Sequence, residues 1–208
     1  MKKIFLIISL FCMSSLLIAQ DIQLPLPQTK GGLPLNETLF RRSTSREFST
    51  TKLSIQQISD LLWCANGVNR PDGKRTAPSA RNAQEIEIYV FLPDATYLYN
   101  AEDNKLIFIS GDDLRTVASH SAFAKVAPVM LLFVANYDKM KGFDESAKEF
   151  YGATDAGFVS QNVYLYCASN TLSTVVLGHI NRDDLKTALK FNGKAILAQC
   201  VGYPADKE

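Results

Sequence analysis

Histidine is scarce in this sequence, and the motifs that commonly carry catalysis are missing as well. Only two of the 208 residues are histidines, His120 and His179. Neither lies in a nucleophile-elbow motif or in a zinc-binding spacing. No Gly-x-Gly-x-x-Gly follows an expected strand, and no Gly-x-x-x-x-Gly-Lys-Ser/Thr occurs. These absences argue against a triad hydrolase, a zinc enzyme, a kinase and a Rossmann dehydrogenase.

Cysteine and net charge are also low. Beyond residue 20 the cysteines are Cys64, Cys167 and Cys200, with no Cys-x-x-Cys among them. Their apolar neighbours favour small core side chains, and a disulfide between two of them is the alternative in an oxidising compartment. Without Lys2 and Lys3, the 22 basic residues fall to 20, against 21 acidic ones. A near-neutral chain is not typical of a general nucleic-acid binder.

The first twenty residues have the pattern of a secretory signal. Two lysines precede an apolar run, residues 4–11, and a small-residue region follows. Cys12 follows Phe11, whereas lipid-attachment cysteines follow small residues, so we expect cleavage after Ala19 or Gln20. No later stretch is long enough to span a membrane. We therefore expect an exported protein, periplasmic or secreted, with no integral membrane segment after cleavage.

The remaining chain predicts an arm and one domain. Residues 21–38 hold three prolines and a Gly-Gly pair, which favours an extended arm before a domain over 39–208. Such an arm can lie on another subunit. A capping-box pattern at Ser54 and Gln57 begins a helix that ends near Gly67. Further helices are expected at 112–123, 154–170 and 182–190, and strands at 86–92, 97–100, 105–110, 128–135, 172–177 and 194–201. This order favours an α+β fold.

A basic segment is the first candidate binding site. Residues 40–49, FRRSTSREFS, intersperse arginines with hydroxyl side chains: Arg41, Arg42, Ser43, Thr44, Ser45 and Arg46. Guanidinium groups bind phosphate oxygens in pairs, so the segment suits a phosphate. A solvated loop that simply precedes a helix is the alternative.

The long loop at 66–84 is the second candidate. Its end, RTAPSARNAQ, has more hydrogen-bonding side chains than a turn needs, and long loops in compact domains are often functional. The charged and aromatic region at 136–152 is either a lid over a ligand or a surface excursion. In the central helix, small side chains suit close approach by another helix or by a flat ligand.

Three segments in this order resemble the nitroreductase-like family of FMN-dependent oxidoreductases. They are RRSTSREF, LLWCANGVNRPDGKRTAPSARNAQEIEIYV and ATDAGFVSQNVYLYCASNTLSTVVLG. The second is closest to the branch that includes peptide azoline dehydrogenases. Gly-Tyr-Pro at 202–204 matches a common ending of the family, and the resemblance covers most of residues 38–204.

The resemblance implies an intertwined α+β homodimer with a central antiparallel or mixed sheet and one FMN at each of two subunit interfaces. It also implies ping-pong hydride transfer between a small-molecule electron donor and an acceptor. The resemblance also implies the residues that contact FMN. Its phosphate would be bound by Arg42, Thr44 and Arg46, with Arg41 and Ser43 as further or alternative contacts. The partner subunit would contribute Pro78, Ser79, Ala80 and Asn82, and the ring would lie near Gln161 and Asn162 and beside a turn at Val175, Val176, Leu177 and Gly178.

The family chemistry is the cofactor's, so no indispensable acid or nucleophile is expected. Many relatives carry a basic pair beyond the Gly-Tyr-Pro segment, whereas this sequence has only Lys207 there. A non-catalytic flavin- or ligand-binding module on the same fold is therefore the alternative.

Overall fold

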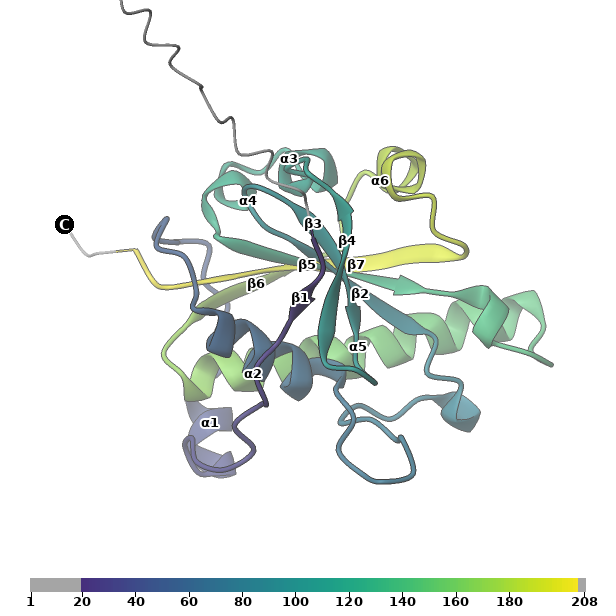
Figure 1. Cartoon of the computed structure of the whole chain (residues 1–208), viewed down its shortest axis with the longest axis horizontal. Coiled ribbons are helices and arrows are strands. Elements are labelled where there is room, and N and C mark those ends of the chain that lie inside the picture. Colours follow the sequence, from purple (N-terminus) through teal and green to yellow (C-terminus); the bar gives the residue numbers. More distant parts are fainter. Residues whose placement is uncertain (1–19, 206–208) are drawn as a thin grey trace, which may run out of the picture.

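The computed structural model describes residues 20–205, and residues 1–19 of the expected signal lie outside them. One seven-stranded antiparallel sheet forms the centre, in the order β1-β4-β3-β2-β5-β7-β6 (Figure 1). The strands are β1 (Ile22–Gln23), β2 (Ile86–Phe91), β3 (Thr96–Asn100), β4 (Lys105–Ser110), β5 (Val129–Ala135), β6 (Ser173–Leu177) and β7 (Lys194–Gly202). The α+β prediction and the antiparallel sheet flanked by helices are confirmed.

Helices cover both faces of this sheet. Figure 1 shows α1 (Leu35–Arg41), α2 (Ile55–Asn66) and α5 (Glu145–Ser169) below it, and α3 (Arg115–Ala118), α4 (Ala122–Val126) and α6 (Arg182–Leu189) above it. One hydrophobic cluster, with Leu61, Leu62 and Val163, fills the side of α2 and α5. A second cluster, with Met130 and Leu185, fills the opposite side. The protein therefore has three layers.

Strand β5, in the interior of the sheet, consists of apolar residues. Every residue of β5 is buried, and β5 pairs with β2 on one side and β7 on the other. A strand covered on both faces reads as a continuous apolar run, which is the pattern that predicts it from the sequence.

The long helix α5 begins earlier than the sequence pattern indicated. The predicted start at residue 154 was wrong, because the charged residues before it are also helical. Asp144 caps the helix by accepting a hydrogen bond from Ala147 N at 2.8 Å. Ion pairs of Lys148 with Glu145 and of Lys194 with Glu149 occupy the charged first turns. The structure thus places 145–152, half of the suggested lid region, in rigid helix.

The arm is not extended throughout, which corrects its predicted boundary. β1 pairs with β4, Leu24 is buried, and the Ser59 hydroxyl donates to the Pro25 carbonyl at 2.6 Å. This part of the arm therefore packs on its own chain. Helix α1 begins at Leu35, directly after Pro34, so the boundary expected at residue 38 falls inside a helix.

Two further comparisons with the sequence predictions concern helices. The capping box of α2 is present, with Ser54 Oγ accepting from Gln57 N and Ser54 N donating to the Gln57 side chain. The single helix expected at 112–123 is wrong, because the chain forms the short helices α3 and α4 with a break between them. Within residues 20–205, no helix has the length and apolar character needed to cross a membrane.

Candidate functional site

The basic segment at 41–46 is fixed to the sheet and to α5 through one tyrosine. The Tyr164 hydroxyl lies 3.0 Å from Thr44 Oγ1 and accepts a hydrogen bond from Val176 N at 3.2 Å. The Arg42 guanidinium lies over the Tyr164 ring, 5.3 Å from its centroid. Ser45 N donates to the Thr174 carbonyl at 3.0 Å. Tyr164 therefore joins the basic segment, α5 and β6 at one point.

The arginines of this segment differ in how they are engaged. Arg41, the last residue of α1, forms an ion pair with Glu37 one helical turn earlier. No carboxylate in residues 20–205 forms an ion pair with Arg42 or Arg46. Ser43 is exposed and lines a cavity of about 220 Å³ together with Arg41 and Ser45. The guanidinium groups of Arg42 and Arg46 are therefore available to pair with a bound anion.

A buried polar network supports this region from behind. Gln199 of β7 is fully buried and accepts a hydrogen bond from Ser160 Oγ of α5 at 2.8 Å. Its amide donates to Thr174 Oγ1 at 3.1 Å, and that hydroxyl donates to the Cys200 carbonyl at 2.8 Å. Buried polar groups that are all satisfied make an arrangement rigid. The network therefore fixes β6 relative to α5.

The second candidate is the loop at 66–84, and the backbone of its last residues, 78–84, is strained. Three of its non-glycine residues adopt positive φ: Arg81 at 53°, Asn82 at 55° and Gln84 at 50°. Such conformations are uncommon outside glycine and persist only where the surroundings enforce them. They concentrate at binding and catalytic sites, so the strain marks this loop as a functional candidate.

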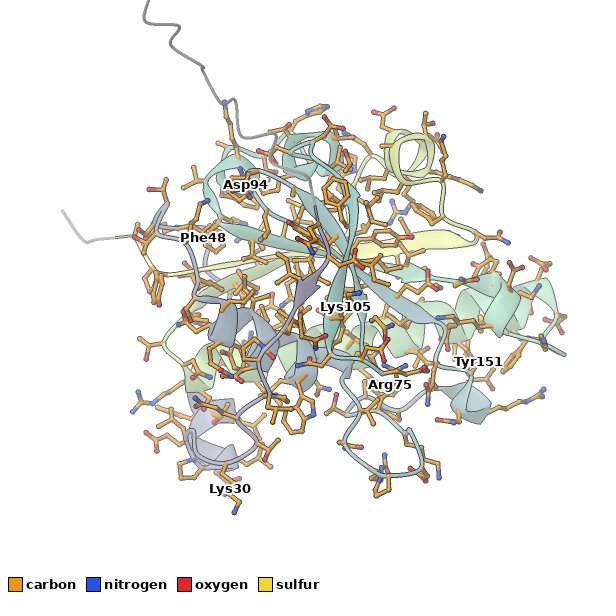
Figure 2. The ribbon with its side chains drawn as sticks, in the orientation of Figure 1. Lys30, Phe48, Arg75, Asp94, Lys105 and Tyr151 are labelled. Atoms are coloured by element: carbon orange, nitrogen blue, oxygen red, sulfur yellow. The ribbon has the colours of Figure 1, made fainter. Side chains whose placement is uncertain are left out.

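Hydrogen bonds within the loop at 66–84 hold this segment in its conformation. Gln84 N donates to Ser79 Oγ at 2.9 Å, and the Gln84 side chain bonds Arg75, Gly73 and Asn82. Arg75, labelled in Figure 2, lies between this loop and the sheet. Arg81 lies over the Phe143 ring, 4.5 Å from its centroid. The residues before α5 thus pack against the loop, as a lid or a support would.

A pair of buried carboxyl groups lies beneath the loop. Asp155 of α5 is 3% exposed, and its Oδ2 accepts a hydrogen bond from Ala80 N at 2.9 Å. Glu85 is fully buried and neighbours Asp155. Burial, together with the Asp155 carboxyl, raises the pKa of Glu85 to about 7.

The remaining candidate residues flank these two segments. Gln161 is exposed on α5, while the Asn162 amide donates to the Ala65 carbonyl at 3.3 Å. Val175 and Leu177 are buried, and Val176 is half-buried. Gly178 is exposed, and its carbonyl accepts from Arg182 at 3.0 Å. Gln161 and Gly178 therefore face solvent, whereas Asn162 has a structural partner.

Within one chain, the two candidate segments lie at separate positions along α5. The basic segment contacts Tyr164 and the loop contacts Asp155, nine residues earlier in the helix. With a rise of 1.5 Å per residue, these anchor points are about 13 Å apart. The structure therefore joins Arg42, Thr44 and Val176 and places Ala80 elsewhere.

Large apolar side chains are exposed on α1 and on α5. They include Leu35 (64%), Leu39 (49%), Phe40 (90%), Phe150 (65%) and Phe158 (44%). On α5 the exposed positions 154, 157, 158 and 161 recur at helical spacing, so they share one face. We call the exposed apolar residues of α1 and α5 the α1–α5 surface. Contiguous apolar surfaces commonly mark contact sites with other molecules.

The cysteines are consistent with core side chains. All three are free thiols, with Cys167 and Cys200 buried and Cys64 half-buried. Burial raises the pKa of Cys64 to about 11 and that of Cys200 to about 12, so neither is a reactive thiolate. In the described part of the chain, no group of three or more His, Cys, Asp or Glu could hold a metal ion.

Three residues of this region were missing from the sequence-based set: Tyr164, Asp155 and Glu85. Asp155 is the one charged residue of the helix predicted at 154–170, and this was the available signal for it. Tyr164 and Glu85 each lie close in sequence to residues of the same type, so the sequence did not single them out. Only the tertiary fold shows their positions in the site.

The chain belongs to the nitroreductase family, whose model matches residues 39–203. Two relatives carry the name "putative nitroreductase". One is MJ1384 of Methanocaldococcus jannaschii, 30% identical over 192 residues that cover 88% of this chain and 96% of the relative. The other is a crystal structure from Ralstonia eutropha, 39% identical, with a TM-score of 0.86 over 90% of this chain and 91% of that one.

A more distant structure shares the fold alone. The NADPH:FMN oxidoreductase from Vibrio harveyi, solved with NAD⁺, is 18% identical, with a TM-score of 0.63. The match covers 83% of this chain and 69% of that chain. The predicted nitroreductase family and the α+β nitroreductase fold are confirmed by the family model and by the more similar structure.

Proposed function

We propose that this protein is an exported FMN-dependent oxidoreductase that acts as a homodimer. Family membership supports an oxidoreductase. The observation that carries the cofactor assignment is the cluster of Arg42, Thr44 and Tyr164, close in sequence to Arg46, which has no ion-pair partner within residues 20–205. Two free guanidinium groups beside hydroxyls suit the FMN phosphate, which is a dianion with several acceptor oxygens.

The flavin ring would lie between groups from two subunits. In one chain, the basic segment and the loop at 78–84 are anchored at different points of α5. A second copy packed on the α1–α5 surface would bring its own loop toward the basic segment of the first. Under this proposal Pro78, Ser79, Ala80 and Asn82 would come from the partner, while Gln161, exposed on α5, would lie near the ring.

The chemistry would be redox transfer through the cofactor. Bound FMN would supply hydride acceptance from a small-molecule donor and delivery to an acceptor, in a ping-pong cycle. The protein's residues would bind, orient and exclude water, and no acid or nucleophile of the chain is required. The segment 61–90 resembles the azoline dehydrogenase branch, so azoline-containing peptides join nitroaromatics, quinones and enones as acceptors to test.

Export is proposed from the first twenty residues alone. Because NAD(P)H is scarce outside the cytoplasm, we expect a different physiological reductant. Cell fractionation and N-terminal sequencing of the mature protein test this part, with a start near Asp21 as the expected result. A full-length cytoplasmic protein would contradict it.

The experiment that tests the cofactor is an absorption spectrum of the mature protein before and after addition of FMN and desalting. We expect a retained flavin band equivalent to about one FMN per chain. Anaerobic reduction with dithionite, followed by addition of each acceptor, then tests turnover. No retained band, and no rise in thermal stability with FMN, would support the non-catalytic ligand-binding module instead.

A further inference from the structure

Of the two buried carboxyl groups beneath the loop at 78–84, Glu85 is unusual because it lacks a hydrogen-bond partner within the described residues. In the described chain, neither carboxyl oxygen of the fully buried Glu85 has a hydrogen-bond partner. The side chain that it meets is the carboxyl of Asp155. Asp155 in turn holds the loop through Ala80 N, at 2.9 Å. One buried acid therefore contacts a second acid that anchors the loop.

The surrounding charges do not neutralise this pair. Lys139, in the turn after β5, also faces Glu85, but its ammonium lies 2.9 Å from the Glu87 carboxylate and is 44% exposed. Arg81 of the loop points to the Phe143 ring and to the Gly142 carbonyl. Two adjacent buried carboxylates without a paired cation would repel each other strongly, so one of them should hold a proton.

The proton belongs on Glu85. The backbone N–H of Ala80 stabilises the ionised form of Asp155. In the described chain neither carboxyl oxygen of Glu85 has a hydrogen-bond partner, and only its own backbone N–H and Lys139 favour its ionised form, which burial and Asp155 outweigh. Burial and the neighbouring Asp155 raise the pKa of Glu85 from its ordinary 4.5 to about 7. If Glu85 is neutral, its carboxyl O–H can donate one hydrogen bond to the Asp155 carboxylate, and this bond gives both side chains a partner.

We propose that neutral Glu85 donates a hydrogen bond to the Asp155 carboxylate, and that this proton-sharing pair positions the loop at 78–84. Both residues act as positioning residues, since they work through Ala80. The consequence for cofactor binding rests on the proposed function, in which this loop contacts FMN of the partner subunit. Loss of the proton would place a second negative charge beneath a strained loop and weaken its anchor at Ala80.

The direction of the pH dependence follows from the raised pKa. Glu85 stabilises the anchored loop fully below its ordinary pKa, and this contribution is lost as the pH rises through about 7. The loop should therefore be anchored in mildly acidic solution and looser above neutrality. FMN binding should weaken over the same interval.

The test follows the Ala80 amide of the ligand-free mature protein by NMR between pH 5 and 8.5, so it needs no cofactor. We expect the chemical shift of this amide to titrate with a midpoint near 7 in the wild type. Glu85→Gln keeps the shape of the neutral acid and should abolish the transition. Asp155→Asn replaces the repelling charge by a donor and should move the transition to lower pH.

Glu87→Gln is the matched control, because it removes a nearby carboxylate that pairs with Lys139 instead. It should keep an Ala80 transition, with any shift of the midpoint toward lower pH, because Lys139, freed from Glu87, favours ionised Glu85. An Ala80 amide that does not titrate in the wild type, or that titrates equally in Glu85→Gln, would overturn the proposal.

FMN titrations then connect the pair to binding. In the wild type we expect the affinity to fall severalfold between pH 6 and 8, and in Glu85→Gln we expect it to stay at its low-pH value. If neither the wild type nor any variant binds FMN, the proposed function fails. The Ala80 titration still tests whether Glu85 and Asp155 share a proton. An equal fall in wild type and Glu85→Gln would overturn the link to binding.

Discussion

The Tyr164 hydroxyl lies 3.0 Å from Thr44 Oγ1 while it accepts the amide of Val176 at 3.2 Å. One phenol on α5 therefore sets the distance between the basic segment and β6. Because the hydroxyl accepts from Val176, its own proton is available for Thr44. The geometry makes Tyr164 the organising residue of the proposed phosphate site.

Tyr164→Phe should weaken FMN binding by up to about thirtyfold, since about 2 kcal/mol would be lost. The substitution keeps the ring under Arg42 but removes both hydrogen bonds, and each is worth about 1 kcal/mol. Tyr166→Phe is the matched control, because its hydroxyl donates to the Gln57 carbonyl at 3.2 Å, away from the basic segment. FMN titration and denaturant unfolding of both variants separate the two effects. Equal FMN affinities in the two variants would count against the role of Tyr164.

The double variant Arg42→Ala with Arg46→Ala should lower FMN affinity by roughly a hundredfold or more. Hydrogen bonds to charged groups contribute about 1.5–3 kcal/mol each, and two guanidiniums are removed. Lys125→Ala with Lys186→Ala removes the same charge from α4 and α6, on the opposite face of the sheet. Fluorescence titration of FMN compares them. If the arginine variant retains its affinity, the phosphate is bound elsewhere.

Much of the fold could be predicted from the sequence, because the patterns that indicate its helices and strands are local. The apolar run of β5 and the capping box at Ser54 each depend on a few neighbouring residues. The start of α5 was missed, since the first turns are charged and exposed and carry no apolar stripe. Local signals therefore predicted buried elements better than exposed ones.

The candidate site was predictable only in part. Its arginines and its polar loop stood out by composition. Asp155 and Glu85 are far apart in sequence and meet only in the folded chain, and positive φ at Arg81 contradicts the ordinary preference of its side chain. Resemblance to a family supplied the cofactor, which composition alone does not name.

Gly193→Ala should destabilise the domain strongly. Gly193 precedes β7 with φ +104°, and an added Cβ would lie 1.9 Å from the Ala135 carbonyl oxygen. The backbone conformation alone costs about 1–2 kcal/mol, and the clash adds about 1–3 kcal/mol. Gly73→Ala is the control, since its φ of +75° is strained but an added Cβ meets nothing within 4 Å. Urea unfolding should show the larger loss at Gly193, and equal losses would mean that the clash relaxes freely.

Phe158→Arg should separate the subunits and release FMN together. Phe158 is 44% exposed near the middle of α5, on the α1–α5 surface that a partner would cover under the proposal. A buried, unpaired guanidinium is unfavourable in such an interface, so the variant should elute as a monomer in light-scattering chromatography. Because the loop at 78–84 would come from the partner, the monomer should also lose its flavin band.

Val126→Arg provides the control for that experiment. Val126 is 38% exposed on α4, across the sheet from the α1–α5 surface. It should remain dimeric and keep FMN. A monomeric Phe158→Arg that still binds FMN at wild-type affinity would show that one chain completes the site, whereas a dimeric variant would place the interface on another surface. Only simultaneous loss of dimer and flavin supports a site made from two subunits.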